Sequence, residues 1–519
     1  MKGTVVKDNL HIERDRCMTK IALERCNTGR FYINAEHLPQ HALFALMQDE
    51  ILGYDKSHDG YFITHDIYEE WALRKIVMYS FQNYIDIKDF FEKLRTSLPI
   101  RRAFRLWLSE CLSENPQEID YFIHEMCSDN ELEEFWTDEL WVSVLLSDSS
   151  TSFFDRFKTN IISDDYKLLK RILFLLRIAC VDTTTNLGFE TTIPKGRGWE
   201  DTISLVYKER EEFFDKNFNY VLPVLFDWCS HNKVGKATRA AGLLALSIIQ
   251  KTETDEHFYI HNDLEEKILK IVFNAAGELK NELKEIFDRV IANYWIGHMD
   301  PYEGLCTKIL EKPYLATELI KALPMSVIQL CDLFWKSNQE EDDFGHAGME
   351  IEYKYGLTNS HKLGYFPASA NQTPIKWLLQ VAFDETIDFI ISFTNTAIEK
   401  YSHSDYGLED VKKIILHIGT TTVCQYVSDA IWGMHRGIAG PVVPCLLQSV
   451  HMALEQTLLV IARDFEPRIV KHILINILTK SKSASLTSIV CSVVFAYPEK
   501  FTDIALILFK TIDLFHLIY

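Results

Sequence analysis

The sequence predicts a mainly α-helical protein, in which a small winged-helix module is followed by an α-solenoid of stacked helical hairpins. Apolar residues recur at spacings of three and four over most of the 519 residues. Glycine and proline lie mainly between these segments, as turn residues do. Strand signals are few and early, and no fixed-period repeat is visible, so the solenoid is predicted from the succession of short helices alone.

The winged-helix prediction depends on a β-hairpin near residue 60. Two short apolar segments, Ile51–Tyr54 and Tyr61–Thr64, flank a polar turn that ends in Asp59-Gly60. An Asp-Gly turn between such segments is the strongest short-range hairpin signal. We therefore expect these segments to form the wing.

The same residues allow a second interpretation, a calcium-binding loop. Oxygen-bearing side chains stand at the first, third, fifth and twelfth positions of an EF-hand pattern, in Asp55, Ser57, Asp59 and Asp66. Position twelve is Asp where Glu is usual, and the residues before the loop resemble a strand. The hairpin is the favoured interpretation.

A His-Asp pair follows the second apolar segment and opens an amphipathic helix. Asp66 is expected to cap this helix, and Glu69 three residues later completes a variant of the capping box. His65 would lie where backbone N–H groups point out of the helix, a position that favours a bound phosphate. A simple polar filler at a helix start is the alternative role for this histidine.

The helices that follow are predicted from apolar spacing alone. They are Phe90–Leu112, Lys167–Val181, Phe214–Cys229, Lys236–Gln250, Leu264–Phe273 and Leu279–Tyr294. The expected organisation is the tail of a preceding helical region at 1–31, the winged helix at 32–84, connecting helices at 85–118 and the helical array at 119–519. The uncapped apolar end of the sequence predicts that this array continues further.

Two polar stretches, Thr183–Asp201 and Asn338–Pro374, are predicted to be loops that interrupt the array. The second contains aromatic residues among glycine and proline, and exposed aromatics on loops of a rigid scaffold often bind partners. The expected partner-binding residues are Tyr353, Tyr355, Tyr365 and Phe366.

Composition limits the classes of partner. The formal net charge of −20 disfavours nucleic acid, whose phosphates require a positive surface. No secretory signal and no apolar run of membrane-spanning length is recognised, and the eleven cysteines contain no Cys-x-x-Cys pair. A cytoplasmic protein with reduced thiols and no membrane contact is expected.

Catalytic motifs are scarce. A Glu-x-Lys string, Glu352 to Lys354, with Asp342 or Asp343 upstream, matches half of a metal-dependent nuclease motif. A solvated acidic loop is the preferred interpretation. His37 and His41 lack a third zinc ligand, so neither a metal nor an enzymatic activity is predicted for this chain.

The stretch Thr64-His65-Asp66 resembles the end of the winged-helix domain in STAND-type signalling ATPases, where immune receptors carry Met-His-Asp. Three further stretches resemble the sensor half of bacterial antiviral STAND (AVAST-type) ATPases: Ser97–Phe104, Tyr365–Ala370 and Trp432–Gly437. The resemblance implies that His65 contacts the β-phosphate of a nucleotide and holds a resting state, with Asp66 as the supporting helix cap.

The phosphate-binding loop of such ATPases is absent from the sequence. The resemblance therefore implies a regulatory and ligand-sensing segment of an antiphage defence protein, which recognises a foreign, possibly viral, protein. ADP or ATP would act only through an ATPase domain encoded upstream, with which the segment could oligomerise; no cofactor is expected in this chain. The alternative is a stand-alone helical-repeat scaffold for protein–protein interaction.

Overall fold

A computed structural model of the chain describes residues 10–114, 116–129, 131–186, 189–254, 262–293, 302–337, 351–358, 365–437 and 442–514. The chain divides into two compact units, Met1–His231 and Asn232–Tyr519. This division falls inside the stretch 119–519, for which the sequence predicts a single array. Within the described residues the fold is mainly α-helical, as predicted, with small two-stranded hairpins.

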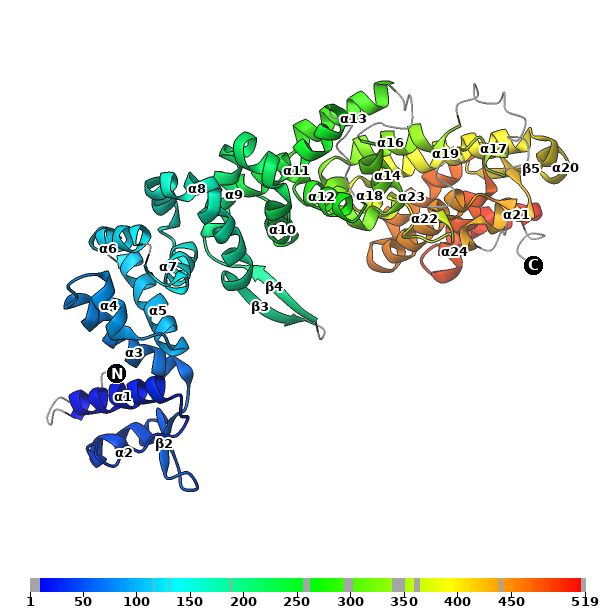
Figure 1. Cartoon of the computed structure of the whole chain (residues 1–519). Coiled ribbons are helices and arrows are strands. Elements are labelled where there is room, and N and C mark those ends of the chain that lie inside the picture. Colours follow the sequence, from blue (N-terminus) through cyan, green and yellow to red (C-terminus); the bar gives the residue numbers. More distant parts are fainter. Residues whose placement is uncertain are drawn as a thin grey trace. The chain divides into compact units, whose positions relative to one another are not determined.

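The N-terminal unit is a succession of helices with two hairpins (Figure 1). Its elements are α1 (Leu10–Thr28), α2 (Gln40–Gln48), β1 (Leu52–Asp55), β2 (Gly60–Ile63), α3 (Asp66–Gln82), α4 (Ile87–Leu94), α5 (Leu98–Glu114), α6 (Pro116–Ser128), α7 (Glu134–Leu146), α8 (Ser150–Ala179), β3 (Val181–Asn186), β4 (Phe189–Pro194), α9 (Gly198–Lys208), a π-helical turn (Arg210–Phe214) and α10 (Asp215–His231). Helix α3 packs against α1 and α5, α5 against α7, α7 against α8, and α8 against α10. Each helix thus shares its apolar face with helices close to it in sequence.

The C-terminal unit continues with helices and one further hairpin. Its elements are α11 (Lys236–Thr254), α12 (Asn262–Asn274), η2 (Ala276–Glu278), α13 (Lys280–Asn293), α14 (Glu303–Glu311), η3 (Pro313–Leu315), α15 (Thr317–Ala322), α16 (Pro324–Trp335), α17 (Ile351–Lys354), α18 (Ile375–Val381), α19 (Phe383–Ser402), α20 (Asp405–Asp410), β5 (Lys412–Ile418), β6 (Thr421–Val427), α21 (Asp429–Trp432), η7 (Gly433–Arg436), α22 (Cys445–Asp464), α23 (Pro467–Lys480), α24 (Ala484–Ala496) and α25 (Thr502–Phe509). Contacts again follow the chain, from α12 to α15, α15 to α18, α18 to α22 and α22 to α24.

The early hairpin is confirmed. Strands β1 and β2 pair antiparallel, with Leu52 opposite Ile63 and Asp55 opposite Gly60. The calcium-loop alternative receives no geometric support, because two of its four oxygen-bearing side chains have other partners. Asp59 accepts from the Tyr54 hydroxyl at 2.5 Å, and Asp66 faces Arg25 on α1.

The connecting helices expected at 85–118 include a break that apolar spacing alone does not show. The stretch Phe90–Leu112 forms two helices, α4 and α5, because Arg95 adopts a left-handed conformation with φ of 62° and ends the first. Pro99 then lies in the first turn of α5, where proline is tolerated. The apolar spacing continues across Arg95, so the break between the two helices cannot be recognised from that spacing.

The predicted loop at Thr183–Asp201 is also wrong. It contains most of a hairpin, β3–β4, whose strands pair from Val181 opposite Pro194 to Asn186 opposite Phe189. Figure 1 shows both strands extending beyond the helices of their unit. Threonine-rich strands such as these have high β-propensity but no apolar alternation, so the pattern search missed them.

A third hairpin, β5–β6, contradicts the expectation that the only β element lies early. Ile414, Leu416 and Ile418 are buried while the residues between them are exposed, the alternation of a half-buried strand. Gly419, with φ of 59°, allows the tight turn between the strands. Burial alternates along this strand but the sequence does not, because Ile415 is apolar and exposed, so the pattern did not predict a strand.

Candidate functional site

His65 lies at the N-terminus of α3, as predicted. It is the residue before the first helical turn, with extended backbone (φ −138°, ψ 134°), and its imidazole is exposed. The ring meets Tyr68 edge-on, with 5.8 Å between the ring centroids. Thr64, the residue before His65, is held in place because its hydroxyl donates to the carbonyls of Glu50 and Ile51 at 2.5 and 3.1 Å.

Asp66 does not cap α3, so the predicted helix cap is wrong. Asp66 is itself the first helical residue, and no side chain makes a cap hydrogen bond there. Its carboxylate instead faces Arg25 of α1, with 3.5 Å between Nη2 and Oδ1. The capping role fails because His65, one residue earlier, already has the extended conformation that an N-cap residue requires.

Glu69, the proposed second half of the capping box, is buried beside the same arginine. Arg25 Nε lies 3.4 Å from Glu69 Oε1, and the Glu69 side chain is 5% exposed. Burial raises the pKa of Glu69, and the charge of Arg25 opposes this rise. Arg25 therefore joins α1 to the start of α3.

The four predicted partner-binding aromatics do not share one surface. Tyr355 and Tyr365 are buried, Tyr353 is half-buried, and only Phe366, which is 69% exposed, is open to solvent. The expectation that Tyr355 and Tyr365 are exposed is wrong.

Both tyrosines are held by specific contacts. Tyr355 stacks on Tyr401 of α19 with 4.3 Å between ring centroids. The indole N–H of Trp335 donates to the Tyr365 hydroxyl at 2.8 Å. The two rings thus lie against the core beside α19 and α16, and they serve packing.

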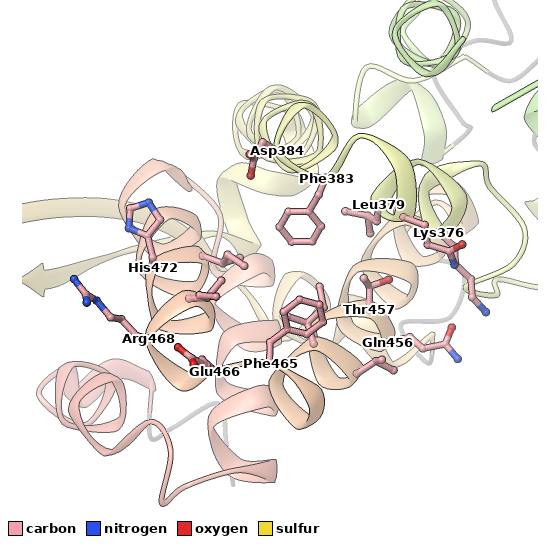
Figure 2. A pocket seen from close by; sticks show the side chains of 15 residues that line it. Lys376, Leu379, Phe383, Asp384, Gln456, Thr457, Phe465, Glu466, Arg468 and His472 are labelled. Carbon is pink, nitrogen blue, oxygen red and sulfur yellow. The ribbon is translucent and has the colours of Figure 1, made fainter. Parts of the chain in front are cut away.

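A groove in the C-terminal unit has a volume of about 1110 Å³. Two helix corners form its walls (Figure 2): α18 turns into α19 at Ala382, and α22 turns into α23 at Phe465–Glu466. Pro467 in the first turn of α23 prevents α22 from continuing. The hollow remains because the two helix pairs pack α18 on α22 and α19 on α23 without filling the space between the corners.

The groove is mainly apolar. Its apolar lining consists of Leu379, Phe383, Val460, Ile461, Phe465, Ile469 and Ile473. Phe465 is 54% exposed and Ile469 is 50% exposed, and Val460 is exposed beside them. Large apolar side chains that converge on an open groove are typical of a binding surface.

Charged side chains border the apolar centre. Figure 2 shows Arg468 and His472 on one side of the groove and Lys376 on the other, with Asp384 and Glu466 also on the rim. Lys376 donates to the Asn371 side chain at 2.7 Å. Within the described part of the chain, neither Arg468 nor His472 forms an ion pair, so both remain available to a ligand.

The opposite face of α22 is buried and, among apolar residues, contains a few polar side chains. His451 is fully buried; its Nδ1 donates to the Leu447 carbonyl at 2.7 Å, and its Nε2 lies 2.9 Å from the Ser485 hydroxyl. The pKa of His451 is lowered to about 4, chiefly by burial; the hydrogen bond to the Leu447 carbonyl opposes this shift, and the charge of His435 adds to it. His435 Nδ1 lies 3.0 Å from the Ser488 hydroxyl.

The nuclease alternative receives no geometric support. Glu352 and Lys354 lie in the short helix α17, and the Lys354 ammonium lies 3.2 Å from the centroid of the Tyr406 ring. Asp342 and Asp343 fall outside the described residues. In the parts of the chain that the structure describes, no group of three or more His, Cys, Asp or Glu side chains could hold a metal ion.

Helix α22 is long and apolar enough to cross a membrane by length and composition, which the sequence analysis overlooked. Of its most apolar window, 56% is buried within the unit, as in the core helix of a soluble protein, so this observation is weak evidence. All eleven cysteines lie in described segments, and none of them forms a disulfide.

The groove was not predicted from the sequence. Its signal was an excess of apolar residues on α22, too many for one buried face, followed by Phe465 and Ile469 around a helix break. Comparison with known proteins adds no further assignment: no protein-family model matches the chain, and no curated protein matches it.

Proposed function

We propose that this chain is a ligand-sensing segment that recognises another protein, and that the groove between the α18–α19 and α22–α23 corners is its contact surface. One observation supports this assignment above others: Val460, Phe465 and Ile469 are large, exposed and apolar, and they converge on a single hollow. Exposed apolar groups of this kind lose water when a partner covers them, at roughly 25 cal/mol per Å².

The proposal includes a finer fold. We propose that residues 32–84 form the winged helix and that the later helices form a solenoid of stacked hairpins. The order helix–strand–strand–helix in α2, β1, β2 and α3 supports the first. The packing of each helix against neighbours in sequence supports the second.

A nucleotide switch belongs to the same proposal. The exposed imidazole of His65 at the start of a 17-residue helix suits contact with a phosphate supplied by an upstream ATPase domain. The resting, ADP-bound state would depend partly on this contact. The chain itself would then bind no nucleotide and catalyse no reaction.

The switch is tested by His65→Ala in the assembly that contains the ATPase domain. A charge-assisted hydrogen bond to phosphate contributes roughly 1.5–3 kcal/mol, so the variant should shift the resting equilibrium about ten- to a hundredfold. The measurements are ligand-independent activity and ADP retention. If neither changes, His65 has no part in the mechanism, and the stand-alone scaffold becomes the better description.

Protein recognition is tested by photocrosslinking in the full chain. We would replace Phe465, Phe366 or Phe44 singly by p-benzoylphenylalanine; these three phenylalanines are all exposed. Irradiation in the source cells, with and without viral challenge, should yield a covalent protein adduct at position 465 only. An adduct at 366 alone would move the contact to the loop first expected, and duplex DNA binding with a steep salt dependence would reject protein recognition.

A further inference from the structure

We infer that the groove takes an amphipathic α-helix of the partner, with its apolar face in the groove and a carboxylate beside Arg468. This inference rests on the proposed function, because it specifies the partner of the same site. The argument uses the walls of the groove, its lining and its charges.

The walls of the groove favour a helix over a strand. Strand addition requires a row of open backbone N–H and C=O groups. The groove is walled by four helices, α18, α19, α22 and α23, whose backbone groups are bonded within each helix except in its first and last turns. An extended peptide would find few main-chain partners here, whereas a helix brings its own backbone bonds already satisfied.

The lining of the groove favours apolar side chains of a partner, which would enter from the solvent side. Its apolar members are mostly aliphatic, with Phe383 and Phe465 as the aromatic residues, and the lining contains no tryptophan or tyrosine. The volume of about 1110 Å³ exceeds the roughly 300–1,000 Å³ typical of small-molecule sites. Because Phe465 and Ile469 remain half exposed, the hollow is an open trough, which suits a row of anchors at helical spacing.

The charges indicate which side of the partner helix faces α23. Arg468 and His472 are one helical turn apart and lie on the same rim (Figure 2). If the partner helix runs along α23, two of its residues that are one turn apart lie opposite Arg468 and His472. A carboxylate of the partner helix opposite Arg468 would form an ion pair with it. Among the described residues, Arg468 has no ion-pair partner.

The test uses three fluorescent peptides of about 18 residues, long enough to form a helix on binding. The first has leucines at helical spacing flanked by glutamates; the second replaces each glutamate by lysine. The third has the composition of the first, with its leucines at every second position. Anisotropy with the full-length chain should show saturable binding of the first peptide and none of the third.

Variants locate the site. Ile469→Asp should weaken binding of the acidic helix at least about tenfold, since a charge would enter the apolar trough. Arg468→Glu should weaken the acidic helix and favour the lysine peptide. Phe366→Asp, on an exposed residue outside the groove, should change nothing. If Ile469→Asp does not fold, Val460→Asp and Arg468→Glu, both on exposed positions, make the same test.

Several outcomes would overturn the inference: no saturable binding of the acidic helix, equal binding of the strand-patterned peptide, or binding that the groove variants leave unchanged. Displacement of the peptide by myristate at lower concentration would reassign the groove to small apolar ligands. The adduct at position 465 separates this failure from that of the proposed function. If the adduct maps to a strand or loop of the partner, protein recognition stands and the proposal of a helical segment fails. If no adduct forms, both proposals fail.

Discussion

Two aromatic regions of the C-terminal unit reverse what local sequence suggests. The sequence around Tyr355 and Tyr365 predicts a loop, yet both rings are buried, against Tyr401 and Trp335 respectively. Phe465 lies at the corner of two long helices, yet it is half exposed. Burial therefore depends on what the fold places over a residue, and the exposed ring is the better candidate for recognition.

The largest expected effect is the loss of the Tyr365 ring. Tyr365→Ala leaves a cavity in the core and removes the hydrogen-bond acceptor of the Trp335 indole. We expect a loss of about 3–5 kcal/mol in the free energy of unfolding, measured by denaturant titration. Phe366→Ala is the matched control and should change stability by less than about 1 kcal/mol. Similar effects of the two variants would contradict the assignment of Tyr365 to the core.

The two faces of α22 give the second prediction, because one face lines the groove and the other holds His451. The pKa of His451 is about 4 in the folded chain against 6.5 when exposed. Between these values the unfolded chain binds a proton that the folded chain does not. The stabilisation is therefore complete above pH 6.5 and is lost as the pH falls toward 4, by about 3 kcal/mol.

This loss is measured by denaturant titration between about pH 7 and pH 4. His435 and Glu455 lie near the same site and contribute to the profile of the native chain. The comparison with His451→Gln isolates the contribution of His451, since glutamine stays neutral throughout. An unchanged pH dependence in this variant would show that His451 does not titrate as described.

The contrast between buried and exposed groups extends to Arg25 of the N-terminal unit and its two carboxylate partners, Glu69 and Asp66. Arg25→Ala leaves the carboxylate of Glu69, 5% exposed, without its cation. A loss of about 2 kcal/mol is expected. Asp66→Ala removes the partner that is 70% exposed and should cost less than about 1 kcal/mol. Thermal unfolding of both variants measures the difference, and equal losses would mean that burial of Glu69 is not the decisive factor.

The smallest stability effect is expected at the groove itself. Phe465→Ala removes a ring that is 54% exposed, so the free energy of unfolding should change by less than about 1 kcal/mol. Its effect should instead appear in the yield of partner adducts or in peptide affinity. A large destabilisation would show that the ring supports the α22–α23 corner rather than a partner.

Much of the architecture was predictable because it depends on local signals. Apolar spacing predicted the helical fold, and Asp59-Gly60 predicted the hairpin of β1 and β2. Where the local signal was weak or ambiguous, prediction failed: the threonine-rich strands β3 and β4 show no alternation, and the break at Arg95 leaves the apolar spacing intact. The candidate site was harder, since neither Val460 nor Ile469 differs in sequence from a core residue.

By itself, the sequence determined the helical class, the excess of negative charge and the position of His65 at a helix start, because composition, periodicity and neighbouring residues decide these properties. The tertiary structure decided that Asp66 pairs with Arg25, that Tyr365 is buried, and that Phe465 borders a groove. Each of these depends on segments distant in sequence that meet only in the folded chain. The exposure of a side chain depends on the residues that surround it in the folded chain, and many of these residues are distant from it in sequence.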